Sequence, residues 1–219
     1  MQIDRPLRLG EIVAETVRLY GERIWATLTI GVVVVAALLG AIPGNDYVDV
    51  GLLSLAFTVA FASAARVAAG DRVGEVWAQV AFRAPLLLAL TVVVSLPVVL
   101  TLITFFVFGL LPVAAWLGLT SFAIPAAMLD GGGLPGALRR TVALARTEYF
   151  HATGVSATFL ALTVLLAVVL YGALVSFAEN DARAAVLVTA FVLAPFFFLG
   201  LAVLYFEQSA RALSSPRRT

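Results

Sequence analysis

The sequence predicts an all-α integral membrane protein with six transmembrane helices, arranged as three hairpins that are each preceded by an amphipathic cytoplasmic helix. Three observations carry this prediction. Of the 219 residues, 62% are hydrophobic and 12% are charged, and the mean hydropathy is +1.06, which lies outside the composition of soluble domains. Long uncharged runs recur along the chain. Nearly all of the arginines lie in alternate connections between these runs.

The uncharged runs match the length of a membrane crossing. A bilayer core about 30 Å thick takes roughly 20 helical residues. The run 84–129 holds 46 residues, so we expect two helices there, with their turn at residues 109–112. The runs are apolar on every face, which favours helices over the alternating pattern of membrane strands. The expected spans, all in one domain 1–219, lie at about 24–42, 48–69, 84–106, 109–129, 150–177 and 184–206.

The distribution of charge predicts the orientation. All 14 basic residues are arginine. With six spans, Arg183 is the only arginine that faces one side, together with Asp46, Asp49, Glu179 and Asp181. The positive-inside rule then places both termini in the cytoplasm, and we expect the protein in the cell (plasma) membrane. A net charge of +1 gives no sign of nucleic-acid binding.

Three amphipathic segments precede the three hairpins, at about 6–22, 71–83 and 133–148. The sequence Arg72-Val73-Gly74-Glu75-Val76 matches Arg8-Leu9-Gly10-Glu11-Ile12, 64 residues earlier, and 130–148 is a weaker third copy. We interpret these segments as elbow helices in a pseudo-threefold repeat, although amphipathic connectors can resemble one another without being repeats. The apolar faces expected in the lipid interface are Leu9, Ile12, Val13, Val17 and Tyr20 in the first copy, and Leu138, Val142, Ala145 and Tyr149 in the third.

Several short motifs resemble the glycerophosphoryl diester phosphodiesterase membrane-domain family. They are Leu9-Gly10-Glu11-Ile12 with Arg18-Leu19-Tyr20, the stretch Ile124-Pro125-Ala126-Ala127-Met128-Leu129-Asp130-Gly131 running into Ala137-Leu138-Arg139-Arg140-Thr141, and Leu204-Tyr205-Phe206-Glu207. The resemblance covers nearly the whole chain and implies a six-helix membrane domain. Some family members also carry a soluble phosphodiesterase domain, for which we expect no room in these 219 residues.

Residues that could support catalysis are sparse. A hydrolase needs a nucleophile and a base, or a metal with several ligands, but His151 is the single histidine and there is no cysteine. We expect His151, where the third elbow meets its span, to be structural or in contact with lipid. The three glycines at 131–133 lack the lysine of a phosphate loop, and Asp46 with Asp49 is a weak candidate for a cation site. The sequence therefore predicts no enzyme activity, no metal and no cofactor.

Two sets of charged residues are candidates for binding or structural roles. Arginine grips phosphate groups in a bidentate way, and arginines on the elbows could reach anionic headgroups or a partner protein. We also expect Arg66 and Glu207, near the cytoplasmic ends of their spans, to take part in ion pairs with charges on the elbows. The candidates for headgroup or partner contacts are Arg8, Arg18, Arg72, Arg139, Arg140 and Arg146.

The favoured function is a non-enzymatic scaffold or accessory subunit of a membrane complex. Its expected partners are membrane lipids and other membrane proteins or further copies of the chain. The alternative is a permease-like component that transports a lipid or another apolar solute. Pro97, Pro112, Pro125 and Pro195 could kink their helices and open a cavity for it, with hydroxyl groups of Thr91, Ser95, Thr101 and Thr104 along the wall. A membrane-embedded lipid enzyme is least favoured, because the sequence has no cluster of polar residues in its spans.

Overall fold

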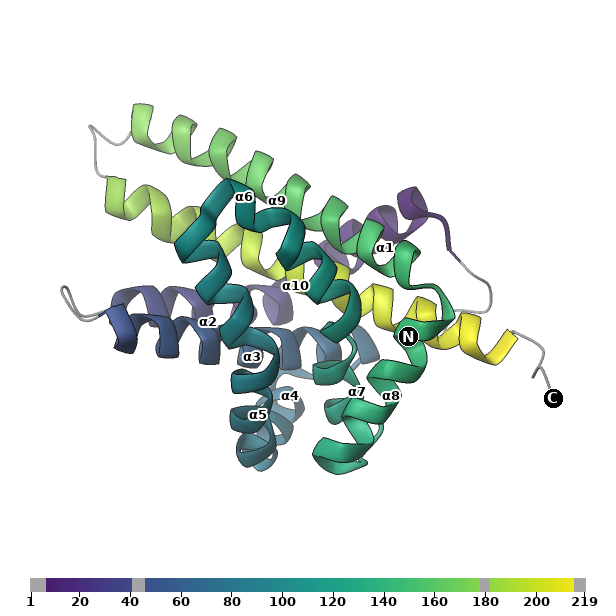
Figure 1. The fold of residues 1–219 in the computed structure, drawn as a ribbon. Helices are drawn as coiled ribbons and strands as arrows, with labels where there is room; N and C mark the ends of the chain where they lie inside the picture. The colour runs from purple at the N-terminus through teal and green to yellow at the C-terminus, as the bar shows by residue number, and fades with distance from the viewer. Residues whose placement is uncertain (1–6, 41–45, 178–181, 215–219) are drawn as a thin grey trace.

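The computed structural model describes residues 7–40, 46–177 and 182–214, and every regular element in these ranges is a helix (Figure 1). The predicted all-helical fold is therefore confirmed for this part of the chain. Arg5, Arg217, Arg218, Glu179 and Asp181, which entered the orientation argument, lie outside it, as do the ends of the expected segments at residues 6 and 41–42. The elements are α1 (Leu9–Glu22), α2 (Ile24–Gly40), α3 (Asp46–Ala69), α4 (Val73–Phe82), α5 (Ala84–Leu90), the π-helical turn η1 (Thr91–Ser95), α6 (Leu96–Thr120), α7 (Ala123–Leu129), α8 (Gly133–Thr147), α9 (Tyr149–Phe177) and α10 (Ala182–Ser214).

Five helical stretches are long and apolar enough to cross a membrane. Helix α2 by itself holds only 17 residues. Helices α1 and α2 meet at an angle of 97°, and if they are counted together as one bent span, the number of spans rises to six. The described residues thus provide five to six apolar spans, where the sequence predicts six. The five are Asp46–Ala69, Ala84–Phe105, Phe108–Leu129, Tyr149–Ser176 and Ala182–Leu213.

The turn inside the long run 84–129 lies earlier than predicted. The chain folds back within α6, between Phe105 and Phe108, and the ribbon reverses beside the label α6 in Figure 1. Gly109 is part of the second arm, and a Cβ built on it would lie 2.7 Å from the carbonyl oxygen of Thr101. A larger residue would separate the two arms. Pro112 also lies in this arm, near its start, where a missing N–H is tolerated best.

A π-helical turn interrupts the first arm of this hairpin. The N–H of Leu96 donates to the carbonyl oxygen of Thr91, five residues back. Pro97 follows directly, and its ring has no N–H and clashes with the carbonyl four residues earlier. The wider turn relieves that clash, as π-bulges do beside prolines in membrane helices. The proline therefore shapes the helix without breaking the span.

Helix α3 lies at the centre of the packing. It contacts α2, α7, α10 and the π-turn, and α2 and α3 run side by side in Figure 1. Small side chains allow this close approach, and Phe57 packs edge-to-face on Phe198 of α10 with ring centroids 4.8 Å apart. The small buried residues of α3 are Ser54, Ala56, Ala60, Ala62, Ser63, Ala64, Ala65 and Ala68.

Helix α1 does not present its whole apolar face to lipid. It packs along α10, and Ile12, Thr16 and Leu19 are buried. Leu9 and Val17, expected on the same face, are 40% and 56% exposed. The helix therefore has one apolar strip against α10 and a second that remains uncovered. The sequence predicts that Leu9, Ile12, Val13, Val17 and Tyr20 form one surface that faces lipid. This prediction is wrong for Ile12, which is buried.

Candidate functional site

Two arginines at the joints between helices bind the ends of other helices. Arg23, between α1 and α2, donates from Nη1 to the carbonyl oxygen of Val67 at 3.1 Å, near the end of α3. Arg83, between α4 and α5, donates from Nη1 to the carbonyl oxygen of Ala127 near the end of α7. The last carbonyl groups of a helix have no partner within it and carry the negative end of its dipole. Each arginine therefore neutralises and caps a helix end.

Arg66 lies in the same region and joins α3 to α7. Its Nε is 2.7 Å from Oδ2 of Asp71, in the connection that follows α3, and its Nη1 donates to the carbonyl oxygen of Met128 at 3.5 Å. The acidic partner lies just before α4.

Glu207 is fully buried near the end of α10, where it forms an ion pair with Arg211 and lies beside His151. Its Oε1 accepts a hydrogen bond from Nε of Arg211, one turn later on the same helix, and its Oε2 lies 3.7 Å from Nε2 of His151. A buried carboxylate is tolerated only with such partners. His151 thus belongs to a structural network at the joint of α8 and α9.

Arg211 connects the end of α10 to two further parts of the chain. Its Nη1 binds Oε2 of Glu148, and its Nη2 donates to the carbonyl oxygen of Leu7 at 3.2 Å. The start of α1, the joint before α9 and the end of α10 therefore converge on one guanidinium group.

Asp130 makes a smaller polar cluster at the end of α7. Its Oδ2 accepts a hydrogen bond of 2.8 Å from the hydroxyl of Tyr205 and lies 3.4 Å from Nε of Arg140. Arg140, a candidate for headgroup contacts, is thus engaged in an ion pair.

Arg18 on α1 is also engaged. Its Nε and Nη2 bind Glu15 at 2.8 and 2.5 Å, and its Nη1 binds Glu22 at 2.7 Å. The hydrogen bond from Arg18 holds the pKa of Glu15 below its usual value, and the two carboxylates raise the pKa of Arg18. A phosphate group would have to displace two carboxylates to reach this guanidinium.

The other sequence candidates are also exposed. Arg8 and Arg72 precede α1 and α4, where their main-chain N–H groups donate to Glu11 at 2.7 Å and Glu75 at 3.0 Å. Both helices therefore begin with a hydrogen bond from a main-chain N–H to the glutamate three residues later.

Arg139 and Arg146 are exposed on α8. Among the described residues neither side chain has an ion pair or a hydrogen bond. The side chains of Arg18 and Arg140 are therefore engaged in ion pairs, whereas those of Arg139 and Arg146 are free among the described residues.

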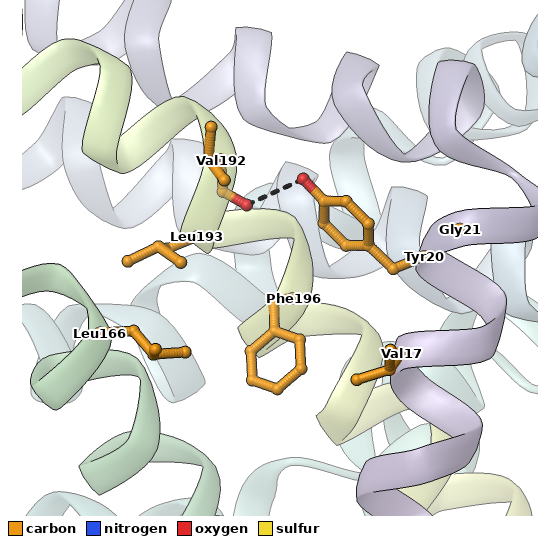
Figure 2. Close-up of a pocket in the computed structure, with 7 residues that line it drawn as sticks. All are labelled: Val17, Tyr20, Gly21, Leu166, Val192, Leu193 and Phe196. Atoms are coloured by element: carbon orange, nitrogen blue, oxygen red, sulfur yellow. Dashed lines mark hydrogen bonds between the residues drawn. The ribbon is translucent and has the colours of Figure 1, made fainter. Parts of the chain in front are cut away.

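An apolar groove lies between α1, α9 and α10 (Figure 2). Its volume is about 320 Å³. The hydroxyl of Tyr20, its main polar group, donates to the carbonyl oxygen of Val192 at 3.1 Å, and burial raises the pKa of Tyr20. The groove therefore suits apolar rather than charged ligands. It is lined by Val17, Tyr20, Gly21, Leu166, Val192, Leu193 and Phe196.

The hydroxyl groups of the π-turn bond to Thr58 of α3 instead of lining this groove. Thr58 and Ser95 lie 2.6 Å apart at their hydroxyl oxygens, and Thr91 donates to Thr58 at 3.0 Å. All three are buried, and Thr101 donates to the main chain of Pro97. This pattern is typical of hydroxyls that satisfy themselves inside a membrane helix.

The part of the chain that the structure describes has no group of three or more His, Cys, Asp or Glu residues placed to hold a metal ion. No family model, curated protein or solved structure matches the chain.

Sequence reasoning missed the capping role of Arg23 and Arg83 and the central place of Arg211. A usable signal was present for the first two, since each is the charged residue directly between an amphipathic segment and an uncharged run.

Proposed function

We propose that this chain is a non-enzymatic multi-pass membrane protein that serves as a scaffold or accessory subunit of a membrane complex and contacts lipids. In this proposal it consists of three units, each an elbow helix followed by a hairpin of spans. Both termini lie on the cytoplasmic side of the plasma membrane. The resemblance to the glycerophosphoryl diester phosphodiesterase membrane-domain family belongs to the same proposal, without the phosphodiesterase activity.

The capping arginines support the division into units. Arg23 reaches the end of α3 and Arg83 reaches the end of α7, and both contacts join residues 44 positions apart. Each of these helices is followed by a glycine with positive φ, Gly70 at +115° and Gly131 at +74°. In the third unit the corresponding joint residue is Glu148, which binds Arg211 at the end of α10. In every unit, a residue at the joint before the first span contacts the end of the second span.

Aromatic residues at the joints support the placement of the elbows at a membrane surface. Trp25, Phe82 and Phe150 lie within two residues of the three joints and are 78%, 81% and 89% exposed. Tryptophan is enriched at membrane interfaces because its ring is apolar and its N–H is polar, and Phe82 and Phe150 place exposed apolar rings at the other two joints. Their recurrence fits three elbows at one level, beside the arginines.

The uncovered face of α9 carries the scaffold proposal. Only 11% of its most apolar stretch is buried within the chain, against 56% for α10. Leu165, Val168 and Val169 are each more than 60% exposed. A helix with so little intramolecular contact has a free face for the helix of a partner subunit or of another copy.

Cross-linking tests this proposal, since the chain has no cysteine and single cysteines need no altered background. Val169→Cys on the uncovered face of α9 should form a cross-linked adduct of one defined mass in native membranes, whereas Phe159→Cys, which is fully buried, should form none. Turnover of a substrate by the purified protein would overturn the non-enzymatic assignment.

A labelling experiment tests the topology. A membrane-impermeant maleimide applied to intact cells should label Tyr47→Cys, whose parent side chain is 92% exposed, and should spare Leu213→Cys until the cells are opened. Labelling of both sites in intact cells would contradict the assigned orientation.

The alternative is a permease-like component for a lipid or other apolar solute, and the groove of Figure 2 is the observation that favours it. Filling the groove with Leu166→Trp should then abolish transport of a fluorescent lipid between the leaflets of a reconstituted vesicle. The exposed Val168→Trp on the same helix is the control. No transport by the unmodified protein would exclude this alternative.

A further inference from the structure

We propose that the exposed arginine pair of α8, Arg139 and Arg146, is a binding site for the phosphate headgroup of an anionic membrane lipid. The inference rests on the proposed function, because it requires α8 to lie at a membrane surface. Of the six arginines that the sequence offered, the proposal assigns headgroup binding to these two, and it identifies the ligand as a lipid phosphodiester.

Helix α8 differs from the other two elbow helices in charge. Its sequence GLPGALRRTVALART has three arginines and no acidic residue, a net charge of +3. Helix α1 has one arginine and three glutamates, a net charge of −2, and α4 has one glutamate and no basic residue, a net charge of −1. Helix α8 itself therefore attracts an anionic surface, whereas α1 and α4 carry a net negative charge and have further arginines only beside them, at positions 8, 23, 72 and 83.

The two arginines share one face of the helix. They are seven residues apart, which is 20° short of two full turns and about 10 Å along the axis. The opposite face is packed into the protein, where Thr141 and Leu144 are 3% and 0% exposed. Both guanidinium groups therefore lie on the side of α8 that faces away from the bundle.

Neither guanidinium has to give up a partner to bind phosphate. Arg139 and Arg146 form no ion pair with any side chain in the described ranges, whereas Arg140 is paired with Asp130. Arg18 is held by four contacts to Glu15 and Glu22. A free guanidinium binds a phosphate with two parallel hydrogen bonds, and it does so at lower cost than one already bound to carboxylates.

The surroundings of the pair favour a lipid over an acidic protein. Val142, between the two arginines, is 42% exposed, and Phe150 at the start of α9 is 89% exposed. At a bilayer surface the lipid phosphates lie directly above the hydrocarbon. Two arginines on either side of an apolar side chain can therefore bind phosphate while the apolar side chain contacts hydrocarbon. Val142 belongs to the apolar stripe that the sequence predicts for this helix, and its exposed position completes this surface.

The test uses the full chain reconstituted in bilayers of phosphatidylcholine with a minority of phosphatidylglycerol. Native mass spectrometry of the released protein measures how many molecules of each lipid remain bound. The unmodified protein should retain phosphatidylglycerol above its bulk fraction. The variant R139Q/R146Q should lose this preference by about five-fold per arginine, as expected for cations at an anionic surface. The matched control R18Q/R72Q removes the same charge from outside α8 and should keep the preference.

Further arms separate the alternatives. R139K/R146K should retain part of the preference, because lysine keeps the charge without the bidentate geometry. Inorganic phosphate added to the bilayers should leave lipid retention unchanged, and displacement by it would point to a free anion as the ligand. Equal loss in R139Q/R146Q and in R18Q/R72Q would overturn the assignment to α8. Resistance to alkaline extraction, measured for every variant, shows separately whether the protein is inserted in the membrane. If the unmodified protein is inserted but shows no preference for phosphatidylglycerol, this inference is wrong and the proposed function is unaffected.

Discussion

Arg23 donates a hydrogen bond from Nη1 to the carbonyl oxygen of Val67, 3.1 Å away and 44 residues later in the chain. The same guanidinium lies 3.5 Å from the carbonyl oxygen of Asp71, and a Cβ built on Gly70 would lie 3.5 Å from its Nη2. One side chain thus connects the start of α2 to the end of α3. A contact between charge and helix end is strong because the carbonyl groups there have no helical partner.

Removing this contact should destabilise the fold. For Arg23→Ala we expect a loss of about 2 kcal/mol in the free energy of unfolding, the range of hydrogen bonds to charged groups. Arg83→Ala, which frees the carbonyl of Ala127, should cost a similar amount. Denaturant unfolding in detergent, followed by circular dichroism, measures both. Arg139→Ala removes an exposed arginine from α8 and should change the stability by less than about 0.5 kcal/mol; a loss equal to that of Arg23→Ala would contradict the capping role.

The buried carboxylate of Glu207 should make Arg211 more important than a surface arginine. Arg211→Ala leaves Glu207 fully buried without its closest cation, and breaking a buried pair in this way costs about 3 kcal/mol. Arg18→Ala breaks pairs in which Arg18 and Glu22 are more than half exposed, so it should cost at most about 1 kcal/mol. The same unfolding measurement compares the two. The buried-pair argument fails if Arg18→Ala proves the more damaging change.

Two glycines in helices should respond in opposite ways to substitution by alanine. A Cβ at Gly31 would lie 2.1 Å from the carbonyl oxygen of Phe191, where α2 crosses α10, whereas a Cβ at Gly10 of α1 meets nothing within 4 Å. Gly31→Ala should therefore destabilise by about 1–3 kcal/mol through overpacking. Gly10→Ala should stabilise by up to about 1 kcal/mol, since alanine loses less conformational entropy in a helix. Thermal unfolding of both variants in one detergent provides the comparison.

The sequence predicts the spans well because a bilayer requires long uncharged helices, and the arginines that interrupt them are conspicuous. It places the turn of the long hairpin a few residues late, since Gly109 and Pro112 act in the packing of the second arm rather than in the turn. The contact between Glu148 and Arg211 joins residues 63 positions apart. It depends on how the helices pack in three dimensions, so no nearby sequence pattern predicts it. The ion pairs of Arg18 could be predicted from the sequence, because Glu15 and Glu22 lie three and four residues away on the same helix.

The exposed tryptophan at the first joint should lie at the membrane interface. Trp25 is 78% exposed, whereas Trp77 and Trp116 pack against the core, and the chain has three tryptophans in all. In a variant with Trp77→Phe and Trp116→Phe, lipids brominated close to the headgroup should quench the fluorescence of Trp25 more strongly than lipids brominated near the chain end. Stronger quenching by the deep label would show that the joint lies in the hydrocarbon and would remove the basis for an interfacial elbow.

The third joint offers an independent version of this measurement. Phe150→Trp in a background with Trp25→Phe, Trp77→Phe and Trp116→Phe moves the single fluorophore to the start of α9, where the parent side chain is 89% exposed. If the joints are equivalent, as the contacts of Arg23 and of Glu148 suggest, both tryptophans should have the same depth. The apolar and polar sides of an indole ring favour the interface, so a common shallow depth is the expected result. Two clearly different depths would mean that the elbows do not lie in one plane, and the three-unit arrangement would then be wrong.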